Sequence, residues 1–134
     1  MSAIINIVNL MGVKRLKMTK NRQLVYELLS KSNVPMTAYE MSRNLEGVSL
    51  TTVYRALDYL VASNVVRYFV LNDFKYYYLN SEHKHFFQCT KCGKFFPLDE
   101  CYMKEYEEHI EKEFGFKISE HFVFFTGLCK ECQK

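Results

Sequence analysis

Four of the five cysteines form two Cys-x-x-Cys pairs, Cys89 with Cys92 and Cys129 with Cys132. Such a turn presents two thiolates about one tetrahedral edge apart, and two turns complete a four-cysteine site that zinc fills without redox chemistry. The gap between the pairs exceeds the usual ribbon spacing, so a folded helix and strand should lie between them. The alternative, a redox dithiol, lacks the βαβ context of such motifs. The pairs therefore predict a structural zinc site that joins two sequence-distant segments.

The first half of the chain predicts three short helices. Thr19, Thr37 and Ser49 can each cap a helix, because a hydroxyl oxygen can accept from the unpaired N–H groups of the first turn. Glu40, three residues after Thr37, completes a capping box. In each helix the apolar residues fall on one face, which indicates packing against a common core.

A hairpin is expected after the third helix. Residues 65–71 and 74–79 are β-rich runs, and Asn72 and Asp73 between them tolerate the left-handed backbone of a two-residue turn. Three helices followed by a hairpin predict a winged helix-turn-helix. The polar stretch 80–84 marks the expected domain boundary.

The second half predicts a smaller α/β dimerisation domain over residues 81–134, after a winged-helix DNA-binding domain over residues 1–80. We expect a helix from about Asp99 to Phe114 and a strand from Phe116 to Thr126, which makes the chain α+β overall. A domain of two or three strands and one helix leaves strand edges and apolar surface unpaired. We therefore expect it to form a homodimer across a two-fold axis.

Two groups of residues predict binding to double-stranded DNA. The first is a basic run near the N-terminus that contains no acidic residue, although a solvated helix end is the alternative. The second is the third helix, whose exposed first turns can enter the major groove, where threonine suits phosphates and arginine suits guanine. Tyr54 borders the buried face and can instead be a half-buried core residue. The predicted DNA contacts are Lys14, Arg15, Lys17, Thr51, Thr52, Tyr54 and Arg55.

Three histidines predict a second, exchangeable metal site. His83 and His85 alternate along an extended segment, so both rings can face the same side, and His121 lies on the polar face of the later strand. Taken singly, each histidine is more often a solvated surface residue. Glu105 and His109 share a helix face and can contribute or form a surface pair. We expect His83, His85, Glu105 and His121 to bind a regulatory divalent metal, Zn2+ or Fe2+.

Other function classes find little support. No apolar run approaches the length of a membrane span, and the first residues lack the basic region and cleavage site of a signal peptide. We expect a cytoplasmic protein without membrane contact. An enzyme with Cys101 as nucleophile and His109 as base is the competing interpretation, but no phosphate loop or acidic pair supports it. We therefore expect neither catalysis nor a small-molecule substrate.

Four motifs follow one another along nearly the whole chain. They are TTVYRAL at 51–57, CTKCG at 89–93, GF at 115–116 followed by His121, and GLC-x-x-C at 127–132. In this order they resemble the ferric uptake regulator family of metal-dependent repressors. The resemblance implies a homodimer that binds a palindromic, AT-rich operator when its sensory site holds metal, and so represses metal-uptake or stress genes.

The sensory residues depart from that family's pattern. Iron- and peroxide-responsive members usually carry a histidine before the second winged-domain helix and an acidic residue near the end of the hairpin. Here these positions are Pro35 and Tyr78, so a second, hairpin-linked metal site is expected to be absent. Counting without gaps from Cys92, the family's acidic ligand falls on Lys104, with Glu105 next to it.

The fifth cysteine favours zinc as the sensed metal. Zinc readily accepts mixed sulfur and nitrogen ligands, and both the presence of Cys101 and the loss of the peroxide-sensing pattern point towards it. A small apolar residue beneath the helix start is the alternative for Cys101. An iron- or peroxide-responsive regulator of the same family and a zinc-stabilised DNA-binding protein that senses nothing both stay open.

Overall fold

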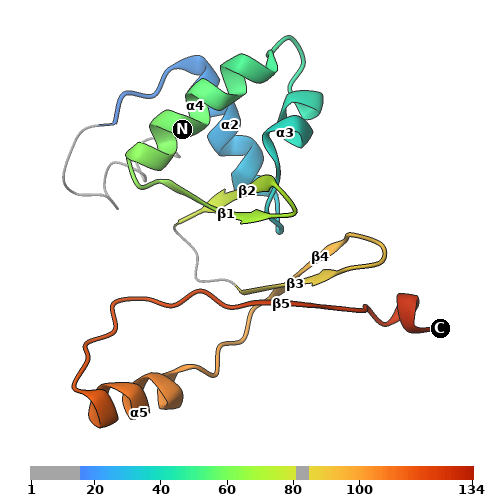
Figure 1. Cartoon of the computed structure of the whole chain (residues 1–134). Coiled ribbons are helices and arrows are strands. Elements are labelled where there is room, and N and C mark those ends of the chain that lie inside the picture. The colour runs from blue at the N-terminus through green and yellow to red at the C-terminus, as the bar shows by residue number, and fades with distance from the viewer. Residues whose placement is uncertain (1–15, 81–84) are drawn as a thin grey trace. The chain divides into compact units, whose positions relative to one another are not determined.

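The computed structural model describes residues 16–80 and 85–134 and divides the chain into two compact units, residues 1–82 and 83–134 (Figure 1). Lys14, Arg15 and His83 lie outside the described residues. Helices and strands both occur, as expected for an α+β chain. Among the described helices, none has the length and apolar character needed to cross a membrane.

The described part of unit 1 contains three helices, and their caps are those expected. Thr19 Oγ1 accepts from Arg22 N–H, and Ser49 Oγ accepts from Thr52 N–H. The capping box is complete, because Thr37 N–H donates to Glu40 Oε1 at 2.8 Å and Glu40 N–H donates to Thr37 Oγ1 at 3.1 Å. The helices are α2 (Lys20–Lys31), α3 (Ala38–Asn44) and α4 (Leu50–Ala62).

A two-stranded hairpin follows α4. Strands β1 (Val66–Leu71) and β2 (Phe74–Leu79) pair antiparallel, with Leu71 opposite Phe74. Asn72 and Asp73 have φ of 51° and 69°, which is the left-handed backbone expected of a two-residue turn. Helices α2 to α4 and this hairpin are the elements of the expected winged helix-turn-helix.

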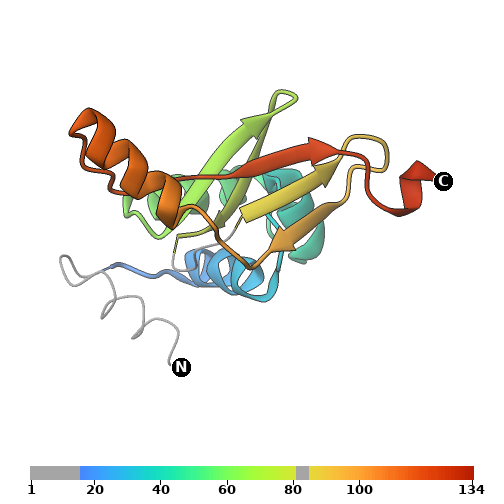
Figure 2. The same ribbon diagram turned by 90° about the horizontal axis from the view of Figure 1, so that it is seen from below.

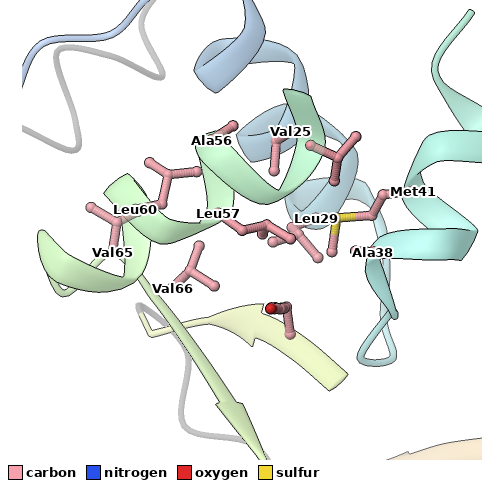
Figure 3. Close-up of a cluster of buried hydrophobic side chains, with 11 residues drawn as sticks. Val25, Leu29, Ala38, Met41, Ala56, Leu57, Leu60, Val65 and Val66 are labelled. Carbon is pink, nitrogen blue, oxygen red and sulfur yellow. The ribbon is translucent and has the colours of Figure 1, made fainter. Parts of the chain in front are cut away.

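The core of unit 1 lies between the three helices and the hairpin (Figure 3). Val25 and Leu29 of α2, Met41 of α3, and Leu57 and Leu60 of α4 are each no more than 4% exposed. They come from the apolar faces that the sequence periodicity identifies. The opposite face of α4 therefore stays available for other contacts.

Replacing Leu57 with alanine should lower the free energy of unfolding of unit 1 by about 2–5 kcal/mol, because a fully buried side chain leaves a cavity. Val70→Ala is a matched control, since Val70 is 61% exposed on β1, and it should change stability by less than about 0.5 kcal/mol. Urea denaturation of the full-length protein, followed by circular dichroism, measures both. Equal losses for the two variants would contradict the assigned core.

Unit 2 contains a three-stranded sheet in the order β4-β3-β5, and Figure 2 shows β3 between its two neighbours. β4 pairs antiparallel and β5 pairs parallel with β3. The expected strand over 116–126 is wrong for most of its length, because regular pairing with β3 begins only at Phe124. The strands are β3 (His85–Cys89), β4 (Phe95–Leu98) and β5 (Phe124–Gly127).

Helix α5 (Lys104–Phe114) begins five residues later than expected, since residues 99–103 are not helical. Gly115, with φ of 71°, ends it as expected and donates its N–H to Glu111 O. No residue of α5 is buried, and Tyr106 and Phe114 are 58% and 62% exposed. Two large aromatic side chains of this helix are therefore mostly uncovered within the described chain.

Candidate functional site

Parallel pairing of β3 with β5 brings the two Cys-x-x-Cys turns together. Cys89 at the end of β3 lies opposite Gly127, and the next residue, Thr90, donates its N–H to Gly127 O at 2.8 Å. All four sulfurs lie within 4.8 Å of one another, and those of Cys92 and Cys129 are 3.9 Å apart. Zinc with four Zn–S bonds of about 2.3 Å has S–S edges of about 3.8 Å. The cluster therefore has the donors and dimensions of a four-cysteine zinc site.

The pKa values of two cysteines in this cluster are shifted in opposite directions. Backbone N–H groups point at Cys89 Sγ, first that of Cys92 and then those of Cys129 and Lys91, and they lower the pKa of Cys89 to about 5. Hydrogen bonds to the Cys129 and then the Cys89 side chain raise the pKa of Cys132 to about 12. Closely spaced thiolates repel one another, so a divalent cation is what allows all four to ionise together.

A second cluster in unit 2 joins His85, Cys101 and His121, whose ligand atoms also lie within 4.8 Å of one another. His121 Nε2 is 3.3 Å from Cys101 Sγ and 3.3 Å from His85 Nε2. Metal bonds of about 2.0–2.3 Å in a tetrahedral arrangement place neighbouring donors about 3.3–3.7 Å apart. Two imidazoles and a thiol thus offer three donors to one ion, and a fourth position stays open for another ligand.

Three separate segments position these side chains. His85 is the first residue of β3 and is 4% exposed, whereas Cys101 lies exposed on the connection between β4 and α5. His121 lies on the connection between α5 and β5. Because the segments are distant in sequence, an ion bound here would tie both connections to the start of the central strand β3.

Glu107 of α5 holds the His121 ring. Its carboxylate oxygen Oε2 lies 2.6 Å from His121 Nδ1, and the two side chains are 26% and 18% exposed. An Nδ1–H that donates to Glu107 leaves Nε2 as the lone-pair nitrogen, which is the tautomer that a metal requires. Glu107 therefore orients the His121 ring through Nδ1, the nitrogen that does not face the other two ligands.

The structure brings together only part of the predicted regulatory set. His85 and His121 meet, Glu105 is not in the group, and His83 lies outside the described residues. Successive helical residues are rotated by about 100°, so Glu105 and Glu107 face nearly opposite sides of α5 and only one of them can meet His121. Gapless counting from Cys92 could not choose between them.

The sequence leaves two roles for Cys101, a metal ligand or a small apolar residue beneath the start of a helix. Cys101 is exposed on a nonhelical segment, and the histidine beside it is His121. His109, its partner in the enzyme interpretation, lies exposed on α5. Because α5 begins only at Lys104, the nonhelical residues 99–103 can place the Cys101 thiol beside His85 and His121.

The hairpin-linked positions hold no metal-ligating cluster. Pro35 is buried, and its neighbour Met36 exchanges two backbone hydrogen bonds with Tyr77 of β2, at 3.0 and 2.7 Å. Burial raises the pKa of Tyr77 to about 12, which keeps this phenol neutral. Within residues 16–80, no three His, Cys, Asp or Glu side chains gather closely enough to share an ion.

The predicted DNA contacts on α4 differ in exposure. Thr51 and Arg55 are exposed, while Thr52 Oγ1 accepts a 2.9 Å hydrogen bond from Ser49 Oγ and so belongs partly to the helix cap. Tyr54 is half-buried against the core, and its ring meets Tyr39 edge to face at 6.5 Å. Burial raises the pKa of Tyr54. Thr51 and Arg55 are therefore the side chains most able to reach a groove.

Lys17, just before α2, is held against Arg22 of α2 and Tyr59 of α4. The Arg22 guanidinium lies 3.6 Å from the centroid of the Tyr59 ring and donates to Lys17 O at 2.6 Å. Lys17 N–H donates to the Tyr59 hydroxyl at 2.7 Å. These contacts use the Lys17 backbone and leave its exposed ammonium group available for a phosphate.

Residues 13–126 match the model of the Ferric uptake regulator family. The Peroxide operon regulator of Bacillus subtilis (strain 168) is 30% identical over 123 residues, covering 88% of this chain and 85% of that protein. The Helicobacter pylori ferric uptake regulator superposes with a TM-score of 0.79 at 22% identity, covering 99% of this chain and 93% of that one. A zinc uptake regulator solved with zinc and DNA gives a TM-score of 0.63 at 20% identity, covering 97% and 92%. The two superpositions show a shared fold.

Proposed function

This chain belongs to the ferric uptake regulator family, and from that membership we propose that it is a metal-responsive repressor that binds a palindromic DNA operator as a homodimer and controls metal-homeostasis genes. The observation that carries the proposal is the presence of two clusters of opposite character in unit 2. The four-cysteine cluster has no open position and suits a permanent ion. The cluster of His85, Cys101 and His121 has an open position and suits an exchangeable one.

Zinc is the sensed metal that the second cluster favours. A thiolate beside two imidazoles suits zinc, whereas sites for manganese and magnesium are built mainly from oxygen ligands. The relatives bear names that refer to peroxide, iron and zinc, so membership alone does not select the metal. An iron- or peroxide-responsive regulator is the alternative within the family. His83 stays a further predicted ligand of the regulatory metal in either case.

The exposed residues of unit 1 support the DNA-binding part of the proposal. Thr51 and Arg55 are exposed on α4, and Lys17, whose backbone is bonded to Tyr59 of that helix, is exposed as well. Arginine can bind the N7 and O6 atoms of guanine, while threonine and lysine suit phosphates. Lys14 and Arg15 stay predicted phosphate contacts.

Uncovered surface in unit 2 supports the homodimer. β4 and β5 are the outer strands of the described sheet, and each has an unpaired edge that can accept another strand. Large apolar side chains are also exposed on this unit, which favours association. They include Tyr106, Phe114, Phe116, Phe122 and Phe125.

Metal analysis and DNA binding together test the proposed function. Protein purified without added metal should retain one zinc per chain, and a random DNA pool selected on the zinc-loaded protein supplies the operator. Zinc should raise operator affinity more than iron or manganese does. Stronger stimulation by iron would support the alternative within the family. No response to any metal would leave a zinc-stabilised DNA-binding protein that does not sense.

Arg55→Ala should reduce discrimination by about 1–3 kcal/mol at one base pair in each half-site, because a bidentate contact to guanine would be lost. Lys17→Ala is the control, since loss of a phosphate contact should weaken all sequences alike and reduce the salt dependence of binding. Competition of operator variants against random DNA measures both effects. Equal losses on operator and random DNA for Arg55→Ala would show that this side chain contacts only the backbone.

A further inference from the structure

Cys101, His121 and Glu107 form a hydrogen-bonded relay whose geometry also suits chemistry at the thiol when no metal is bound. Cys101 Sγ lies 3.3 Å from His121 Nε2, and the opposite nitrogen Nδ1 lies 2.6 Å from Glu107 Oε2. A thiol beside a base that a third group orients is the arrangement of an activated cysteine nucleophile. The Cys101 side chain is also exposed, so a small reactant can reach it.

We propose that Cys101 is an oxidation site, at which a hydroperoxide converts the thiol to a sulfenic acid when the second metal site is empty. The inference rests on the proposed function in one respect, namely that a metal bound there occupies Cys101 Sγ. Metal binding and oxidation then compete for the same sulfur, and the site reports on oxidants as well as on metal.

The reaction balances with hydroperoxide as the only co-reactant. The Cys101 proton passes to His121 Nε2 as the sulfur attacks the terminal peroxide oxygen, so that an S–O bond forms and the O–O bond breaks. The sulfur loses two electrons and the peroxide gains them. The departing oxygen takes the proton from His121 and leaves as water from hydrogen peroxide, or as an alcohol from an organic hydroperoxide. Glu107 holds the ring in place throughout.

The four other cysteines are set apart from this chemistry. They lie in the cluster that suits a permanent zinc ion, which would occupy all four sulfurs. Cys101 alone shares its cluster with two histidines rather than other thiols. A sulfenic acid there cannot supply a thiolate to zinc, so the oxidised site is left with only its two imidazole donors.

Mass spectrometry with a sulfenic-acid trap tests the inference on the full-length dimer that retains its structural zinc. After the second site is emptied with a chelator, the protein is treated with hydrogen peroxide in the presence of dimedone. We expect the adduct at Cys101. Added zinc should suppress it, and the oxidised protein should bind one zinc fewer per chain than the reduced protein.

Two variants test whether Cys101 reacts because of the relay or only because its side chain is exposed. His121→Ala should slow adduct formation by about 10²-fold or more, because it removes the proton acceptor. His109→Ala is the matched control, since this exposed histidine of α5 is outside the cluster, and it should leave the rate unchanged.

The outcomes distinguish this inference from the proposed function. No adduct at Cys101 in the emptied protein would overturn the oxidation site, and an unchanged rate in His121→Ala would overturn the relay. An adduct that forms equally fast with and without bound zinc would instead show that Cys101 is not a metal ligand. In that case the ligand assignment fails while the oxidation site stands.

Discussion

Replacing Cys92 with serine should unfold unit 2, release the structural zinc and abolish the dimer. The sulfur of Cys92 is one of four within 4.8 Å, and a serine hydroxyl is a poor substitute for a thiolate ligand. Zinc binding to such sites contributes about 10–16 kcal/mol, as much as the whole stability of a small domain, which is about 5–15 kcal/mol. The loss should therefore exceed what the rest of unit 2 can supply.

The sparse core of unit 2 makes this dependence strong. Among its described residues only His85, Phe86, Gln88 and Cys89 are buried, and all four come from β3. Unit 1 has its own core of helix and hairpin residues and should stay folded in the variant. Elemental analysis, sedimentation and circular dichroism measure zinc content, dimer and remaining helix.

Cys101→Ser is the matched control for the loss of a thiol, because Cys101 is outside the four-cysteine cluster. That variant should keep one zinc per chain and remain dimeric. A Cys92→Ser protein that is stable, dimeric and undiminished in zinc would refute the structural site.

His121→Ala should remain folded and dimeric with one zinc per chain, yet bind operator no better with added metal than without it. His121 Nε2 is the atom next to both other donors, at 3.3 Å from each. Its removal leaves only His85 and Cys101 to hold an ion. Coupling between metal and DNA is typically about 1–3 kcal/mol, so about 5- to 150-fold stimulation should disappear.

The position of the site along the chain explains why its occupancy should affect DNA binding. His85 begins β3, and residues 80–84 connect it to the end of β2 in unit 1. An ion held at His85, next to this connection, would restrict the separation of two DNA-binding units in a dimer, and so match it to the half-sites.

Titration of operator binding with zinc, iron and manganese measures the effect, and His109→Ala on the same helix serves as the control. The control should respond to metal as the unaltered protein does. If His121→Ala retains its metal-stimulated binding, the proposed regulatory site is wrong.

Unit 1 could be predicted closely because its signals are local. The capping box needs only Thr37 and Glu40, and the turn needs only Asn72 and Asp73, so neighbouring residues contain the information. Unit 2 was predicted less well, because β5 is defined by its pairing with a distant strand. β4 was missed altogether, and its Pro97 is unfavourable in a strand unless it lies at an edge.

The metal sites show the same difference between local and long-range signals. Cys-x-x-Cys spacing identifies the four-cysteine cluster without any knowledge of the fold. The partner of His121 could not be chosen this way, because Glu105 and Glu107 differ in helix face rather than composition. Cys101 reaches the histidines only because α5 begins at Lys104, a boundary that no capping residue marks.

The parallel pairing of β3 with β5 also sets an order of events during synthesis. Cys92 and Cys129 meet although they are 37 positions apart in the sequence, and contacts of such long range form late. Unit 1 is complete before Cys129 and Cys132 leave the ribosome, and N-terminal domains generally fold first. Until its last segment arrives, a nascent chain can therefore offer only the Cys89–Cys92 half of the four-cysteine site. In zinc-starved cells we expect newly made molecules to accumulate with a folded unit 1 and an open unit 2, which makes zinc supply at translation a determinant of how much dimer exists.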